Sequence, residues 1–475
     1  MQLEVAQESE LGVDLGGPNP LVVSSIGQAD DVVLVSNDIH ALQCLLDLSL
    51  QYCLKHHVSL RAEKTKLQVF SDKKSSMSAY YGSIVSSISF GGQKIEFEDE
   101  AEHVGLIRST SGNLVHISNR FIAHKKCLAA VLPVGLARRH RANPAASIRI
   151  HSCYATPVLL SWLPSLVMNS SEVKMVDSYL KVTQQNLLKL MKKTPACVVH
   201  FLAGTLPGTA LLHMRQLSLF GMITKLPESL LNIHGINVLT TAPPSASSWF
   251  QQIRQLCLLY QLPHPLKLLY EPLSSHLYKK LVKSKIINYW ELQLRNNAKE
   301  LSSLPYFKPA FMSLAKPHPM WTACRSNPFE CHKAVITARM LSGRYPTDKL
   351  QRHWTQNKHG KCLLPNCSPP SEGSLEHLLL NCPSLASTRS KLLCLLFSVA
   401  EEHIALAKII YTALYSSDQS ELMQLLLDCT SMHVVIESCR VFNNHIRDRL
   451  LYLGRTWCYN IHRERMSQLG LFEFR

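Results

Sequence analysis

Acidic side chains are missing from a long part of this 475-residue sequence. Between His103 and Ser171 there is no carboxylate, although eight Lys and Arg residues lie there. Residues 103–227 carry a net charge of +13, residues 1–102 carry −8, and the whole chain carries +16. A surface of ordinary solubility mixes both signs, so a block of one sign predicts a polyanionic partner, RNA or DNA. A generic basic surface is the alternative interpretation.

The bases expected to contact nucleic acid lie in this carboxylate-free stretch and in the helix expected after it. They are Arg108, Arg120, Lys125, Lys126, Arg138, Arg139, Arg141, Arg149, Lys181 and Lys189. Contacts to the phosphate backbone need only positive charge and helix ends, and they carry no sequence information.

Long apolar runs are also absent, because no stretch approaches the roughly 18–20 apolar residues that a membrane span needs. The first four residues include an acid where a secretory signal would carry bases. Fifteen cysteines, an odd number spread over the chain, do not form the framework of a disulfide-rich secreted protein. We therefore expect an intracellular protein with reduced thiols, not secreted, without a membrane partner and compatible with a nuclear location.

Two β-branched runs near the start predict a buried hairpin over residues 21–36, with Asp30 and Asp31 at its tip. Asn37 or Asp38 can cap a helix whose apolar residues recur at helical spacing. A strand over residues 67–70 follows a Lys-Thr pair. An Asp-Asp doublet alone is more often a solvated turn than a metal site.

This order of hairpin, helix and Lys-Thr strand resembles the second half of the palm in the reverse transcriptases of non-LTR (LINE-like) retrotransposons. Gln28 stands in place of the aromatic residue of the family's aromatic-Ala-Asp-Asp tip. The segment Leu60–Thr65 lacks the Asn of the family's Asn-x-x-Lys-Thr motif. Residues 102–106 resemble the short strand that leads such enzymes from the palm to the thumb.

The resemblance implies an RNA-directed DNA polymerase, a nucleotidyltransferase in which Asp30 and Asp31 hold Mg²⁺ and Lys64 lies near the incoming triphosphate. Two such ions clamp the attacking and leaving oxygens. The family's third carboxylate lies on an earlier palm strand, and no similar motif precedes Asp30 here. We therefore expect a truncated reverse transcriptase that is inactive alone and binds Mg²⁺ only when a partner chain supplies the missing palm and fingers. The alternative is a non-catalytic nucleic-acid-binding protein using a basic thumb and a zinc knuckle.

The expected fold class is α+β: a partial polymerase palm of antiparallel strands with helices, then a mostly α-helical thumb and connector, then a small zinc-knuckle-like module. Five regions follow one another: 1–110 the partial palm, 111–227 the basic helical thumb-like region, 228–330 a proline-punctuated helical connector, 331–390 the Cys/His module and 391–475 a helical tail.

Apolar spacing predicts several helices in the later regions. They cover Glu172–Lys193 with Ser171 as the cap, Trp249–Leu262 and Tyr278–Asn297. Within the tail, residues 400–475 are expected to form two or three amphipathic helices. Their basic face would carry Arg447, Arg449, Arg455, Arg463 and Arg465.

The most specific motif is a late cluster of Cys362, Cys367, His377 and Cys382, with gaps of four, nine and four residues. Three soft sulfur ligands and one imidazole favour Zn²⁺. Ser374 can cap a short helix over 375–381, and His377 and Cys382 converge only if that helix ends before Cys382. Together with its flanking residues, the cluster resembles the Cys-Cys-His-Cys segment that follows the thumb in many non-LTR retrotransposon polyproteins. Accidental clustering and ligation by Cys324, Cys331 or His332 are the alternatives.

Overall fold

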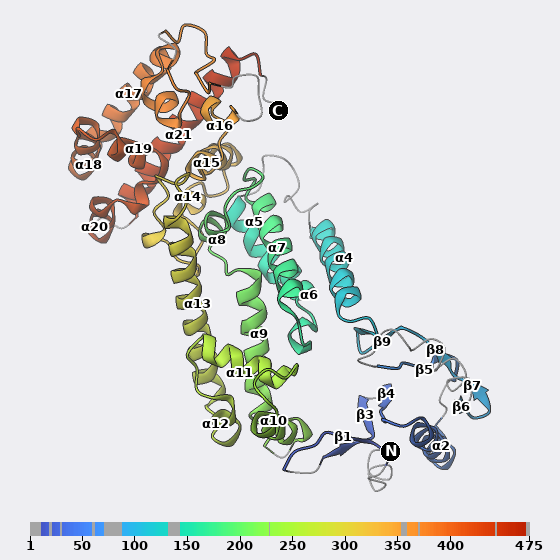
Figure 1. The fold of residues 1–475 in the computed structure, drawn as a ribbon. Coiled ribbons are helices and arrows are strands. Elements are labelled where there is room, and N and C mark those ends of the chain that lie inside the picture. Colours follow the sequence, from blue (N-terminus) through green and yellow to red (C-terminus); the bar gives the residue numbers. More distant parts are fainter. Residues whose placement is uncertain are drawn as a thin grey trace. The chain divides into compact units, whose positions relative to one another are not determined.

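The structure is a computed structural model that describes residues 11–18, 21–28, 31–58, 62–70, 88–131, 143–227, 229–352, 359–368, 371–441 and 444–471. Within these residues the protein is mostly helical and has five small two-stranded sheets (Figure 1). The α+β expectation is therefore correct only in this coarser form. The chain divides into two compact units, each built from separated segments. Unit 1 comprises 1–124, 158–174 and 211–286, and unit 2 comprises 125–157, 175–210 and 287–475.

The strands of the described residues all lie in the first part of unit 1. Their bounds are β1 Val13–Asp14, β2 Val22–Val23, β3 Ser25–Gln28, β4 Asp31–Leu34, β5 Lys66–Leu67, β6 Ser89–Phe90, β7 Gln93–Lys94, β8 Glu96–Phe97, β9 Glu100–His103 and β10 Leu106–Ser109. Four pairs are antiparallel, namely β1–β2, β3–β4, β6–β7 and β9–β10, whereas β5 pairs parallel with β8.

The hairpin expected near the start is present as β3 and β4, in which Gln28 is paired with Asp31. Its expected burial is wrong, because none of the side chains described in these two strands is buried and Ile26 is 48% exposed. A two-stranded sheet offers too little area to bury both of its faces. The following helix, α2 Ile39–Lys55, begins at Asp38, whose carboxylate accepts a hydrogen bond from Ala41 N at 2.8 Å. The cap expected at this position is confirmed.

The apolar side of α2 packs on the small strands to form a local core. Leu46 of α2, Leu67 of β5 and Phe90 of β6 are buried together in it, with Ile88 and Ile95. The single strand expected over 102–106 is instead the hairpin β9–β10. Val104 and Gly105 have φ angles of 53° and 77°, and two left-handed residues are what a tight hairpin turn requires.

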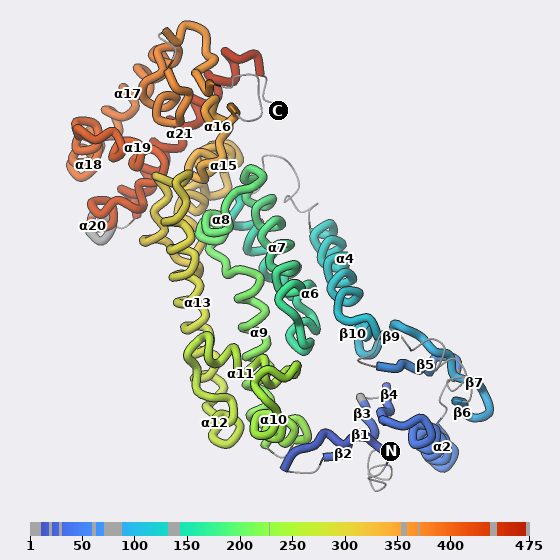
Figure 2. Tube along the Cα trace, viewed as in Figure 1, coloured from blue at the N-terminus to red at the C-terminus, as the bar shows by residue number. Residues whose placement is uncertain are grey.

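The remaining helices of unit 1 follow these strands. Those lying wholly or partly in this unit are α4 Leu114–Val131, α6 Thr156–Leu159, α7 Ser170–Leu187, α9 Gly208–Ile223, α10 Leu230–Thr241, α11 Trp249–Leu259, α12 Pro265–Tyr270 and the first half of α13 Ser275–Lys299. Helices α10, α11 and α12 pack together (Figure 2). The helices expected from residues 249 and 278 are confirmed as α11 and α13 to within a few residues at each end.

In unit 2, the C-terminal helices pack around the long helix α21. The helices that lie wholly in this unit are α5 Pro144–Ile150, α8 Ala196–Ala203, α14 Pro319–Thr322, α15 Pro328–Leu341, α16 Asp348–Gln351, α17 Ala386–Glu401, α18 Ile404–Tyr415, α19 Gln419–Asp428, α20 His433–Val441 and α21 His445–Gln468. Helices α15, α17 and α19 all pack against α21 (Figure 1). Gly454 of α21 allows this contact, because a Cβ there would lie 2.3 Å from Leu426 O of α19.

The expected basic face of the tail is wrong, since Arg455 and Arg465 point into the bundle and are each only 3% exposed. Arg455 donates to the carboxylate of Glu330 in α15 at 3.0 Å. A buried guanidinium needs such a partner, because an unpaired charge in the protein interior is costly. The sequence cannot distinguish these two arginines from the exposed ones by spacing alone.

The helix expected over 172–193 is α7, which begins at Ser170 and ends at Leu187. Its cap is Asn169 and not Ser171: Asn169 Oδ1 accepts from Ser171 N and Glu172 N, both at 3.0 Å. Glu172 accepts in turn from Asn169 N at 2.9 Å, which completes a reciprocal capping box.

Among the described helices, no single one is long and apolar enough to cross a membrane, although the bent pair α8 and α9 passes that test together.

Candidate metal centre

Four side chains expected to bind zinc lie together in unit 2. One ligand atom from each of Cys362, Cys367, His377 and Cys382 lies within 4.8 Å of the others, in a buried group. The sulfurs of Cys362 and Cys382 are 3.8 Å apart, and Cys367 Sγ is 3.4 Å from His377 Nε2. The group can hold a metal ion such as zinc.

These separations can be compared with those in a tetrahedral zinc site. Zn–S bonds of about 2.3 Å and a Zn–N bond of about 2.0–2.1 Å, meeting at a tetrahedral angle, place sulfurs about 3.8 Å apart and a sulfur and nitrogen about 3.6 Å apart. The distances of 3.8 Å and 3.4 Å agree with these values. These two separations therefore fit a tetrahedral zinc ion, and the other ligand atoms lie within 4.8 Å of one another.

The first pair of ligands is held by a short loop. Cys362 N donates to Ser371 O at 2.9 Å, and a β-bridge pairs Lys361 with Glu372. Cys367 N donates back to Leu364 O at 3.3 Å after a left-handed residue, Asn366, with φ 63°. This turn places both thiols of the four-residue gap on the same side.

The second pair is brought together by a π-helical turn over His377–Asn381. Ser374 acts as expected at the start of the helix, since its hydroxyl accepts from His377 N at 3.1 Å. Cys382 N then donates to His377 O at 2.6 Å, which is the i→i+5 bond of a π-turn. This bond stacks residues five apart, whereas an α-helix would separate them by about 140°. The helix also ends at Cys382, as expected, because Cys382 is extended.

The pKa values of two of the thiols, those of Cys362 and Cys382, are shifted in opposite directions. A hydrogen bond from the Cys362 thiol, together with the charge of His377, lowers the pKa of Cys382 to about 5 against the opposing effect of burial. The same contact raises the pKa of Cys362. The contact between the two thiols therefore favours a thiolate on one member of the pair, and the thiolate is the form of cysteine that binds metal.

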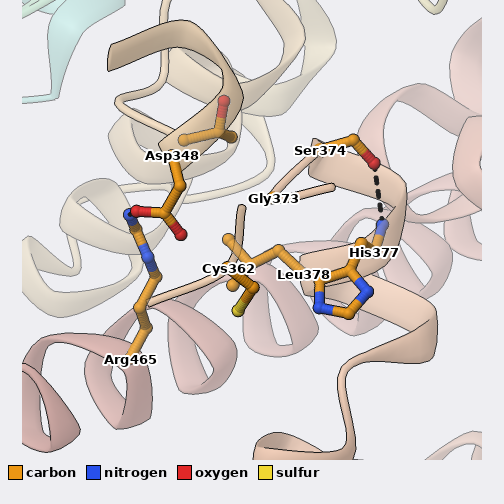
Figure 3. A pocket seen from close by; sticks show the side chains of 8 residues that line it. Asp348, Cys362, Gly373, Ser374, His377, Leu378 and Arg465 are labelled. Carbon is orange, nitrogen blue, oxygen red and sulfur yellow. Dashed lines mark hydrogen bonds and ion pairs between the residues drawn. The ribbon is translucent and has the colours of Figure 1, made fainter. Parts of the chain in front are cut away.

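A buried ion pair between Arg465 and Asp348 supports the loop that holds the first two ligands (Figure 3). Arg465 of α21 donates to Asp348 Oδ1 at 3.2 Å, and Asp348 Oδ2 accepts from Leu363 N at 3.4 Å. Gly373 lies against Asp348, where a Cβ would come within 2.6 Å of its Cβ. Because Leu363 follows the first ligand, this pair fixes the direction of Cys362.

Sequence reasoning missed Asp348, Gly373 and the role of Arg465, as well as Trp457, whose indole Nε1 donates to Leu379 O at 3.3 Å. Asp348, Trp457 and Arg465 give no local signal, because they approach the cluster from other parts of the chain. Gly373 lies within the ligand segment itself, and only its close contact with Asp348 reveals its role. The alternative ligands Cys324 and Cys331 are buried but do not join the group. Among the described residues, this group is the one metal-type cluster of three or more ligands.

The residues expected to bind Mg²⁺ and triphosphate are in unit 1, not in unit 2 with the Cys₃His group. Asp31 begins β4 and is exposed, and Lys64 is exposed at the end of a 3₁₀ turn over Ala62–Lys64. Asp30 lies outside the described residues. Their roles in binding Mg²⁺ and triphosphate stay predictions.

The bases expected to contact phosphate differ in their exposure. Lys125, Lys126 and Arg149 are exposed, whereas Arg108 and Arg120 are half-buried. Lys181 and Lys189 are also half-buried, and burial lowers the pKa of both ammonium groups. The expected contacts Arg138, Arg139 and Arg141 lie outside the described residues.

Fold and site together define a mostly helical protein with a buried Cys₃His group in unit 2. No protein-family model, curated protein or solved structure matches the chain.

Proposed function

We propose that this chain binds RNA or DNA through the phosphate backbone and belongs to a reverse-transcriptase-like protein of non-LTR retrotransposon type. The observation that carries the proposal is a set of exposed bases in a part of the sequence without carboxylates. Lys125, Lys126 and Arg149 are exposed, and no ion pair is formed by these three within the described structure. Cations without internal partners are available for phosphates.

The Cys₃His group supports this proposal as a structural element and not as a catalyst. Four protein ligands fill a tetrahedral zinc site and leave no open position for substrate, which is typical of structural zinc. Zinc would hold the loop 359–368 and the turn after Ser374 in one arrangement. The order of a palm-like hairpin, basic helices and a Cys/His module supports the resemblance described above.

Nucleotidyl transfer is the second candidate function, and the β3–β4 hairpin favours it. Asp31 lies at the start of β4, and the helix that follows β4 in the chain is α2. This order is the one that the resemblance implies. A two-metal centre needs carboxylates from more than this hairpin, and no group of three metal-type ligands forms near Asp31 in the described part of unit 1. We expect no primer extension by this chain alone with Mg²⁺ or Mn²⁺. Nucleotide incorporation that disappears in Asp31→Asn would establish the polymerase instead.

Fluorescence anisotropy with a labelled duplex and a labelled single strand, between about 50 and 200 mM salt, tests nucleic-acid binding. The logarithm of affinity should fall linearly with the logarithm of salt concentration, with a slope of about −0.9 per duplex phosphate contacted. The variant Lys125→Gln/Lys126→Gln/Arg149→Gln should reduce the slope by about 2–3.

The matched control variant, Lys316→Gln/Lys391→Gln/Lys408→Gln, changes three exposed lysines elsewhere and should leave the slope unchanged. We call it the control triple below. An affinity of the wild-type chain that does not respond to salt would contradict the proposal.

A further inference from the structure

The first half of α13, which lies in the region expected to be a connector, has a strongly basic face. His276, Lys279, Lys280 and Lys283 are all exposed along it. Residues 211–290 contain eight Lys and Arg residues and only two acids, Glu228 and Glu271. We call these four exposed residues the α13 basic face.

Packing within unit 1 fixes which side of α13 is exposed. Tyr278, Val282 and Ile286 recur at a spacing of four and are 5%, 2% and 0% exposed. Gly221 of α9 lets α13 approach closely, because a Cβ there would lie 2.4 Å from the Tyr278 ring. The helix is therefore anchored on its apolar side, and the lysines lie on the part of its surface that stays exposed.

The charges on this face have no compensation within the described protein. No ion pair is formed by Lys279, Lys280 or Lys283 there. The first turn of α13 contains no acid that could pair with them. Like charges at i and i+4, as in Lys279 and Lys283, repel one another. An anionic partner would relieve this repulsion.

We propose that the α13 basic face is a second surface for a nucleic-acid backbone, separate in sequence from the basic stretch 103–227; this inference rests on the proposed function. An anionic membrane is the less suitable partner. A membrane-binding helix inserts a continuous exposed apolar side. In the first half of α13, Tyr278, Val282 and Ile286 are buried in unit 1, and Leu277, which is 57% exposed, does not form such a side by itself. Compact ammonium groups contact phosphates as point charges. This surface would therefore recognise the charge of the nucleic-acid backbone and not the base sequence.

The test compares the full-length wild-type chain with Lys279→Gln/Lys280→Gln/Lys283→Gln in the anisotropy titration described above. Gln has about the helix propensity of Lys, and the substitutions remove the repulsion between Lys279 and Lys283 without changing the buried residues of α13, so the variant should fold. We expect the salt slope to fall by about 2–3 and the affinity at low salt to fall about tenfold or more. The control triple should behave like the wild type.

Four results would overturn the inference, and they differ in what they say about the proposed function. Unchanged binding by the α13 variant, with salt-sensitive binding by the wild type, rejects this surface and keeps the proposed function. An equal loss in the control triple reveals a general effect of net charge. No binding by the wild type rejects both proposals. Binding to phosphatidylserine vesicles but not to nucleic acid, lost in the α13 variant, assigns the face to a membrane.

Discussion

At the scale of single residues, the Cys₃His group can be tested with one thiol. Cys367 Sγ faces His377 Nε2 at 3.4 Å, so Cys367→Ser removes a sulfur ligand without adding bulk. We expect the wild type, purified reduced and without chelator, to contain one zinc per chain and the variant to contain almost none. Metal analysis by mass spectrometry measures the ratio.

Cys394→Ser is the matched control for this substitution, because Cys394 is an exposed free thiol of α17 outside the group. It should keep the zinc content of the wild type. Less than half a zinc per chain in the wild type would support accidental clustering. An equal zinc content in the wild type and in Cys367→Ser would show that the zinc binds at another site.

Asp348 allows a second test, directed at the support of the ligand loop. Asp348→Asn keeps the shape of the side chain but leaves Arg465, which is 3% exposed, without its counter-charge. We expect a loss of about 3–5 kcal/mol in unfolding free energy and about 10–100-fold weaker zinc binding. Urea unfolding and competition with a zinc chelator measure the two effects.

The control for Asp348 is its neighbour Lys349, which pairs with Glu372 at 2.9 Å on the exposed surface. Lys349→Gln should cost only about 0–1 kcal/mol. If both variants lose the same stability, the buried pair has no special role in holding the loop.

At the scale of elements, helix α8 contains a buried imidazole that makes the protein sensitive to acid. His200 is 1% exposed, and neither ring nitrogen has a hydrogen-bond partner in the described structure. Burial lowers its pKa from 6.5 to about 4. The negative charge of Asp177 opposes this shift, and the positive charge of Lys181 adds to it. The unfolded chain therefore binds a proton below pH 6.5 before the folded chain does, and stability decreases as the pH falls from about 6.5 to about 4.

We expect His200 alone to reduce the unfolding free energy by about 2 kcal/mol between pH 7 and pH 5. His200→Leu should remove this part of the pH dependence and raise stability at pH 7 by about 1–3 kcal/mol, because no unpaired polar group stays buried. Urea unfolding at the two pH values measures both changes. An identical pH dependence in wild type and variant would contradict this account.

The helices show what the sequence could predict and what it could not. The start of α2 at Asp38 follows from local chemistry, because a carboxylate before an apolar stripe can accept from the first free amides. The start of α7 was missed by two residues, since Asn169 and Ser171 are both good caps. The carboxylate of Glu172, three residues after Asn169, distinguishes them.

The metal ligands were predictable because residue type and spacing together determine the chemistry. The π-turn between His377 and Cys382 was not, because an i→i+5 bond has no sequence signature and is chosen by packing. Tertiary pairing likewise decided the positions of Arg455 and Arg465. Their partners, Glu330 and Asp348, lie more than a hundred residues away in the sequence.

At the scale of the whole molecule, the two units differ in what organises them. Unit 2 contains the metal-type group next to a helical bundle, whereas the helices α10 to α12 of unit 1 pack through apolar contacts without any such group in the described residues. Removal of a metal should therefore affect the two units differently. The loop and turn that hold the ligands should respond most strongly, because so short a segment buries little apolar area to offset its ordering entropy.

Hydrogen exchange measured by mass spectrometry, with and without a zinc chelator, tests this difference. We expect residues 359–385 to lose protection on chelation, together with the part of α21 that contacts them, because Trp457 is bonded to Leu379 O and Arg465 to Asp348. Peptides of α10 to α12 should exchange at the same rate in both conditions. Because a structural zinc supplies about 10–16 kcal/mol to small modules, the change should be large. Equal loss across both units would show that they unfold as one, and no loss in 359–385 would show that the loop is ordered by its protein contacts alone.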